Sequence, residues 1–152
     1  MDTTPAETLV WDVRLFVYQF FADHERPPTS TETATRFTIS VRQAESMYQQ
    51  LHMLHALFLE PGQTAIRMAH PFSGIPTPFR VMVNGYRYYA NCAWDALGIP
   101  AMLHTDATVE AQYSDTLRPI VLKVHNKHVS GSQPLVHFAL PFKHWYDDLV
   151  FT

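Results

Sequence analysis

Apolar residues recur at intervals of three and four along the first third of the chain. This spacing predicts an amphipathic helix over residues 8–22 and another over residues 40–55. The later helix begins at Ser40, and the spacing from Ser40 to Gln43 is that of a capping box. The threonine-rich residues 29–37 predict a short helix between the other two. The first lobe is therefore expected to contain three helices.

Two short apolar runs follow these helices. Residues 56–60 and 64–68 flank Pro61-Gly62-Gln63, which is typical of a turn, so they predict the two strands of a hairpin. Three helices followed by a hairpin is the element order of a winged helix. Residues 1–69 are accordingly predicted to form a winged-helix-like N-terminal domain.

A proline-rich segment separates this lobe from the rest of the chain. Pro71, Pro76 and Pro78 disfavour regular structure, so residues 70–80 are predicted to be a linker. Beyond it, two apolar and aromatic runs enclose Asn84-Gly85, the dipeptide best suited to the positive φ angles of a two-residue hairpin turn. A hairpin is therefore expected at the start of a second lobe.

The second lobe, residues 81–152, mixes helix and strand patterns. Residues 90–97 contain helix formers, and Gly98 and Pro100 are expected to stop this helix. Three further strands are predicted, over residues 107–113, 120–125 and 135–140. The predicted fold class is α+β: a winged-helix-like three-helix lobe, then a small and mostly antiparallel sheet lobe with a cysteine-bearing helix.

Charge and cysteine content narrow the function classes. The 152 residues carry a formal net charge of -3, so neither DNA nor a membrane surface is an expected partner. Arg36 and Arg42 flank the start of the predicted third helix, but acidic residues accompany them. No signal peptide or membrane span is recognised, and a cytoplasmic location is predicted. With a single cysteine, an intramolecular disulfide and a cysteine zinc finger are excluded.

That cysteine lies in a pattern that suits chemistry. Asn91 is a good N-cap, which would place Cys92 in the first helical turn, where the positive end of the helix dipole favours a thiolate. Asp95 follows three residues later, so its carboxyl group would project over the same face as the sulfur. The spacing by itself is also compatible with a small buried cysteine and a solvated aspartate.

The segment 86–101, from Tyr86 through Cys92-Ala93-Trp94-Asp95 to Pro100-Ala101, resembles the signature of the organomercurial (alkylmercury) lyase family. The resemblance implies cleavage of a carbon–mercury bond by protonolysis, with cysteine thiolates capturing mercury and an aspartate protonating the leaving carbon. Cys92, as nucleophile and mercury ligand, and Asp95, as proton carrier, fall on two of these three roles. The implied partners are a small organomercurial and low-molecular-weight thiols; no cofactor is implied, and Hg(II) is substrate and product.

The chain departs from the family pattern in its cysteines. The resemblance places a second catalytic cysteine near Phe151 and Thr152, and this chain lacks it. A further family cysteine would fall near Tyr113, where an aromatic residue can fill the core. Because the apolar run at the C-terminus resembles the start of a buried strand, the sequence predicts a truncated catalytic domain. In a complete chain, an external thiol would have to supply the second sulfur.

Aromatic residues surround the predicted site. Tyr88, Tyr89 and Trp94 are predicted to wall an apolar substrate pocket over the sulfur, although strand alternation does not decide which tyrosine faces inward. The densest histidine group is predicted to lie at the surface, because its spacing is not that of a zinc helix motif. Its members are His125, His128, His137 and His144.

Two other function classes remain open at this point. One is a non-catalytic binding protein or sensor that uses Cys92 for a soft metal or a thiol adduct. The other is a winged-helix regulator whose second lobe senses a ligand, or a lobe that forms a homodimer rather than reading DNA. Cleavage of a carbon–mercury bond distinguishes the lyase from both.

Overall fold

The computed structural model describes residues 5–138 and 140–145. Its N-terminal part forms three helices: α1 (Pro5–His24), α2 (Ser30–Phe37) and α3 (Val41–Met53). The predicted capping box is confirmed, since the Ser40 hydroxyl accepts from the Gln43 backbone N–H at 3.2 Å. Thr29 and Glu32 form a second capping box at the start of α2, which explains why a threonine-rich segment is helical.

A small antiparallel sheet follows the helices, with strand order β1-β2-β3. The predicted hairpin is present as β1 (Phe58–Leu59) and β2 (Ile66–Ala69). Its third strand, β3 (Phe72–Ser73), lies within residues 70–80, so the prediction of a linker without regular structure is wrong there. Phe72 is fully buried, and the prolines of this segment lie outside the paired residues, which is why they do not prevent the pairing.

A larger antiparallel sheet forms the second half, in the order β5-β4-β6-β7-β8. Its strands are β4 (Arg80–Val83), β5 (Tyr86–Tyr89), β6 (Ala107–Gln112), β7 (Pro119–His125) and β8 (His128–Gly131). Asn84 and Gly85 adopt φ angles of 50° and 89° between β4 and β5, so the predicted two-residue turn is confirmed.

The last strand differs from the sequence prediction. β8 forms a hairpin with β7 through Asn126 and Lys127, both with positive φ, whereas residues 135–138 form no strand. Residue 139 of the predicted strand 135–140 is outside the described residues. The apolar run was misleading because Leu135 is 96% exposed, so no sheet buries its side chain.

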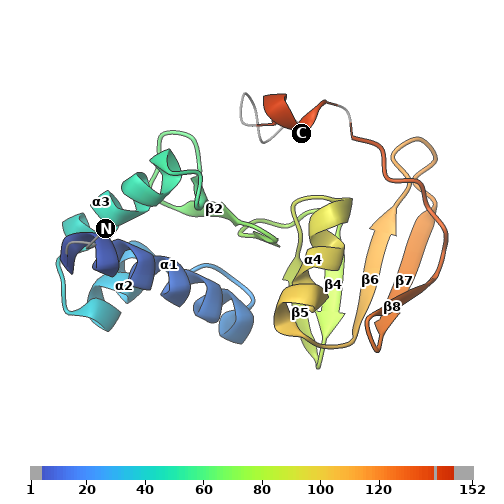
Figure 1. The fold of residues 1–152 in the computed structure, drawn as a ribbon, viewed down its shortest axis with the longest axis horizontal. Coiled ribbons are helices and arrows are strands. Elements are labelled where there is room, and N and C mark those ends of the chain that lie inside the picture. The colour runs from blue at the N-terminus through green and yellow to red at the C-terminus, as the bar shows by residue number, and fades with distance from the viewer. Residues whose placement is uncertain (1–4, 139, 146–152) are drawn as a thin grey trace.

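Helix α4 (Ala93–Leu103) continues through the residues expected to end it. It packs on β4 and β6, and burial of Ala96, Ile99 and Pro100 stabilises a helix that contains a proline. A Cβ on Gly98 would lie 3.1 Å from the Pro71 Cβ, so the glycine permits close packing rather than ending the helix. Figure 1 shows α4 lying across one face of the large sheet.

The helical half and the large sheet share one hydrophobic core. The Phe72 ring stacks on Phe21 of α1 at 5.1 Å and contacts Tyr88 of β5 at 5.3 Å, measured between ring centroids. A bridge between Phe72 and Ala90 joins the two sheets. Phe72 of β3 belongs to this shared core. The division into two domains joined by a linker at residues 70–80 stays a prediction. Among the described helices, none combines the length and apolarity that a bilayer crossing requires.

Candidate active site

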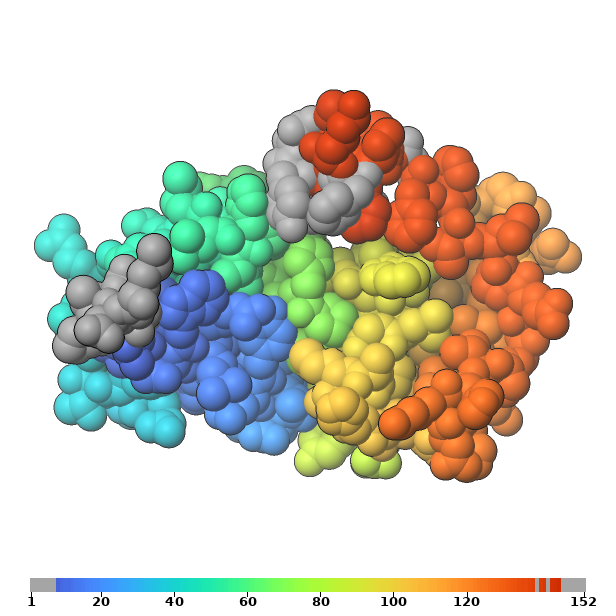
Figure 2. Space-filling model, viewed as in Figure 1, coloured from blue at the N-terminus to red at the C-terminus, as the bar shows by residue number. Residues whose placement is uncertain are grey.

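A cavity of about 620 Å³ opens beside the start of α4. Its walls come from the first turn of α4, the segment before β4, strands β6 and β7, and the C-terminal segment. Figure 2 shows that segment, in red, arching over the region of the yellow α4. Cys92, Trp94 and Asp95 all line the cavity, so the structure brings these three predicted site residues together.

Cys92 is the N-cap of α4, with φ −151° and ψ −179°. The expectation that Asn91 caps the helix, with Cys92 inside the first turn, is therefore wrong. The Asn91 side chain does not cap the helix because it turns toward the segment before β3. There its Nδ2 donates to the backbone carbonyls of Pro71 and Phe72 at 3.3 and 3.2 Å.

The environment of the Cys92 sulfur favours the protonated thiol. Burial raises the pKa of this thiol, and the Asp95 carboxylate adds to the rise. The backbone N–H groups of Asp95 and Trp94 act in the opposite direction but do not reverse it. The start of α4 does offer the backbone N–H donors expected from the sequence, but desolvation has the larger effect on the pKa of the thiol. A base beside the sulfur is therefore needed to generate the thiolate.

Asp95 is such a base and lies in reach of the thiol. It is 8% exposed, which contradicts the alternative of a solvated helix aspartate. Its Oδ2 accepts a hydrogen bond from Asn91 Nδ2 at 3.0 Å and lies 3.1 Å from His70 Nδ1. The carboxyl group also interacts with the Cys92 thiol. The Cys92 sulfur and the Asp95 carboxyl group thus lie at one cavity, and the roles expected for them stay predictions.

His70 and Asn91 are site residues that the sequence reasoning missed. His70 lies in the segment predicted to be a linker, and its partner Asp95 is 25 residues further along the chain. Its ring packs edge-on against Phe58 at 5.6 Å between centroids. No local pattern could have found His70, because only the packing of β3 against the start of α4 brings it to Asp95.

The aromatic wall of the cavity differs from the one predicted. Trp94 lines it with 64% of its surface exposed, but Tyr88 and Tyr89 are not among the described residues that do. Tyr88 is buried between the two halves, where its hydroxyl donates to the Ala22 carbonyl at 2.6 Å. The predicted pocket role of Tyr88 is thus wrong, because this face of β5 packs into the core.

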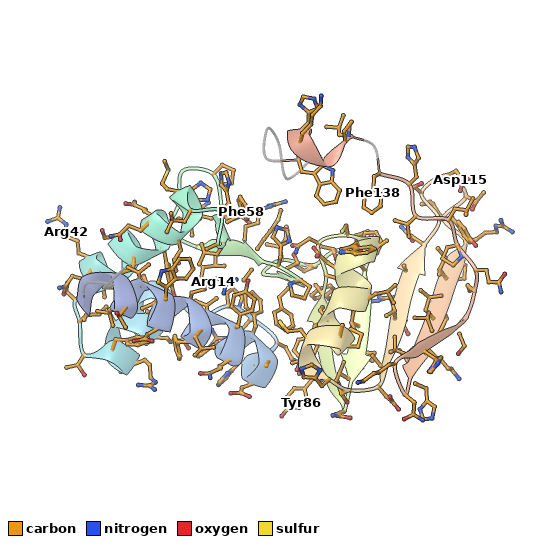
Figure 3. All side chains as sticks on the ribbon, viewed as in Figure 1. Arg14, Arg42, Phe58, Tyr86, Asp115 and Phe138 are labelled. Carbon is orange, nitrogen blue, oxygen red and sulfur yellow. The ribbon has the colours of Figure 1, made fainter. Side chains whose placement is uncertain are left out.

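The C-terminal segment supplies the aromatic rings instead. Phe138 extends from this segment toward the start of α4 (Figure 3). Its ring meets Trp94 edge-on at 6.4 Å and stacks on Trp145 at 5.3 Å between centroids. Tyr113, expected as core filler, also lines the cavity, half-buried. These rings give the cavity an apolar part, while Asp95 and Asn91 give it a polar one.

Within the described residues, no three histidine, cysteine or acidic side chains lie close enough to hold a metal ion. His125 pairs with Asp106 on the exposed β7–β8 hairpin, at 2.5 Å. Cys92 offers a thiol sulfur to a soft metal at the cavity.

Comparisons with known proteins identify a family and a similar fold. The model of the alkylmercury lyase (MerB) family matches residues 72–151, more than half of the chain. Alkylmercury lyases from Bacillus cereus and Clostridium butyricum are each 37% identical over 60 residues, which is 40% of this chain and 28% of either relative. A crystal structure of the mercury-bound form of MerB2 is similar in fold, with a TM-score of 0.61 and 21% sequence identity. That likeness covers 82% of this chain and 63% of the MerB2 chain.

The fold and the site together define a mixed α+β protein with antiparallel sheets and a cysteine–aspartate pair at one cavity. The chain belongs to the alkylmercury lyase family.

Proposed function

We propose that the protein cleaves the carbon–mercury bond of organomercurials by protonolysis, giving Hg(II) and a hydrocarbon. The observation that supports this most is the placement of Cys92 and Asp95 on one cavity, where the Asp95 carboxylate contributes to the raised pKa of the thiol. Family membership supports the same reaction. The apolar rings of Trp94 and Phe138 suit the organic group of the substrate.

The reaction follows from the two side chains. The Cys92 thiol passes its proton to the Asp95 carboxylate, and the resulting thiolate forms a sulfur–mercury bond, since Hg(II) is a soft metal. Asp95 then protonates the carbon as the carbon–mercury bond breaks, and the bonding pair stays with that carbon. The hydrocarbon leaves, and Hg(II) remains on the Cys92 sulfur. Asp95 thus transfers the proton of the Cys92 thiol to the carbon.

A second sulfur is supplied by a low-molecular-weight thiol from solution. This chain contains one cysteine, whereas two thiolates on mercury push electron density toward the carbon and weaken its bond to the metal. The cavity of about 620 Å³ is large enough to admit a small thiol beside the substrate. A second molecule of the small thiol then replaces Cys92 on Hg(II): its sulfur forms the new bond to mercury, the Cys92–mercury bond breaks, and its proton returns to the Cys92 sulfur.

The remaining features of the protein fit this function. The order α1, α2, α3, β1 and β2 supports a winged-helix-like N-terminal lobe, and the net charge of -3 argues against DNA as its partner. A free thiol and a supply of small thiols suit a cytoplasmic location. The reaction requires no resident cofactor, because Hg(II) enters and leaves as part of substrate and product. A homodimer remains a prediction.

The test is to incubate the protein with phenylmercury and excess small-molecule thiol, following benzene and Hg(II) release. Wild type should release benzene, and C92S and D95A should not. D12A, which removes an exposed carboxylate on α1, is the matched control and should behave as wild type. Tight phenylmercury binding without benzene would contradict the lyase and support the capture protein or sensor instead.

A further inference from the structure

We propose that His70 and Asn91 are positioning residues that hold the Asp95 carboxyl group in the orientation needed for proton transfer between Cys92 and the substrate carbon. This inference rests on the proposed function, because it assigns a role within the same reaction. Neither residue was expected at the site from the sequence, and neither has to touch the substrate in order to act.

The hydrogen bonds all converge on one oxygen of Asp95. Asn91 Nδ2 donates to Oδ2 at 3.0 Å, and His70 Nδ1 lies 3.1 Å from the same atom. The other oxygen, Oδ1, takes part in neither contact. With the His70 proton on Nδ1, which is the tautomer that this proposal requires, Oδ2 accepts from two donors. Two donors on one oxygen restrict rotation of this short side chain and so orient the second oxygen as well. The carboxyl group therefore presents one constrained oxygen and one available for the proton.

The donors are themselves held in place. Asn91 Nδ2 reaches the backbone carbonyls of Pro71 and Phe72, and β3 secures this segment in the core. The His70 ring rests edge-on against the buried Phe58. The Asp95 side chain is thus tied to the first sheet while its backbone belongs to α4. Relative motion between the sheet and the helix would move the carboxyl group away from the sulfur.

The chemistry explains why this matters. Proton delivery to a leaving carbon demands close approach of donor and acceptor, and small misplacements reduce rates sharply. Mutation of a residue that orients a reacting group through a hydrogen bond typically lowers activity by roughly 10-fold to 100-fold. The equilibrium affinity of the Cys92 sulfur for mercury, in contrast, is set by the sulfur–mercury bond and not by which base has accepted the thiol proton. Loss of the positioning bonds should therefore slow cleavage while leaving capture intact.

Variants of His70 separate the hydrogen bond from the packing. H70F keeps a ring against Phe58 but loses the donor, whereas H70N places an amide donor near the position of Nδ1. With phenylmercury and excess thiol, H70F should cleave about 10-fold to 100-fold more slowly than wild type at unchanged phenylmercury affinity. H70N should recover most of the rate. H128F, on the exposed β8, is the matched control and should match wild type.

Asn91 is tested by N91L, which has nearly the same shape and removes all of its donors at once. Its cleavage rate should fall at least as far as that of H70F, again with phenylmercury affinity retained. Wild-type rates in both H70F and N91L would overturn the proposal. So would an equal loss of capture and cleavage, or a failure of H70N to recover activity, because either would indicate a purely structural role.

A nitrogen-15 NMR measurement addresses the geometry without relying on turnover. At a pH where free imidazole is neutral, donation to Asp95 requires the proton of His70 to reside on Nδ1. Wild type should show this tautomer, and D95A should shift His70 toward the usual Nε2–H form. An Nε2–H form already present in wild type would overturn the proposal. Absence of benzene release from wild type would instead overturn the proposed function, together with any reaction role for His70.

Discussion

The Tyr88 hydroxyl donates a hydrogen bond to the backbone carbonyl of Ala22, with 2.6 Å between the two oxygens. Ala22 lies in the last turn of α1, where carbonyl groups have no partner within the helix. Tyr88 belongs to β5, so this bond joins the helical half to the large sheet across 66 residues of sequence. The residue predicted to line the substrate pocket is instead a link between the two halves.

Removal of this hydroxyl should destabilise the fold. Y88F leaves the partly buried Ala22 carbonyl without its partner, and we expect a loss of about 1 kcal/mol in the free energy of unfolding, measured with urea. Y86F is the matched control, because Tyr86 lies on the same strand and is 43% exposed. Its effect should stay within about 0.5 kcal/mol. Equal stability of Y88F and Y86F would show that the hydrogen bond between β5 and α1 contributes nothing measurable.

Buried tyrosines should make the protein less stable at high pH. Burial raises the pKa of Tyr48 from 10.0 to about 12, and the pKa of Tyr88 rises to about 12 for the same main reason. The unfolded chain loses these phenol protons near pH 10, while the folded chain keeps them to about pH 12. Their contribution is thus fully present below pH 10 and is lost between these values. The free energy of unfolding of Y48F, measured with urea, should therefore decrease less steeply with pH over this range than that of wild type. An identical pH dependence in Y48F and wild type would contradict the prediction.

The thiol of Cys92 should react only slowly with alkylating reagents at neutral pH. Because burial raises its pKa, the rate of iodoacetamide modification should reach half of its maximum above the pH found for an ordinary cysteine. Since Asp95 adds to the rise, D95N should lower that midpoint. The single cysteine makes the site of labelling unambiguous. A wild-type midpoint below that of a free thiol would show that the backbone N–H groups at the start of α4 affect the thiol pKa more than burial does.

Trp94 should favour aromatic substrates. Its ring lines the cavity and contacts Phe138 edge-on, and contacts between aromatic groups are worth about 0.5–1.5 kcal/mol beyond area burial. W94A should therefore weaken phenylmercury binding up to about 10-fold relative to methylmercury, as measured by competition for Cys92. W11A removes a tryptophan on α1 that is 47% exposed and serves as the control. A parallel loss for both substrates in W94A would assign the ring to general packing.

Local patterns predicted the elements of this fold well where neighbouring residues decide the conformation. The capping box at Ser40 and the turn at Asn84-Gly85 depend on residues only a few positions apart, and both are present. The apolar run at residues 135–138 misled because apolarity shows only that a side chain favours burial, not which surface it contacts. Phe138 contacts Trp94 at the cavity rather than a neighbouring strand.

The sequence by itself determined the three N-terminal helices, the hairpins that follow α3 and enclose Asn84-Gly85, and the placement of Cys92 and Asp95 at the start of a helix. Those features follow from backbone preferences and from the fixed spacing of side chains on a helix. Only the tertiary structure decided that Pro100 lies inside α4, that Asn91 turns away from the helix and that His70 reaches Asp95. Each of these depends on contacts between distant segments, where burial and partner geometry outweigh local preference.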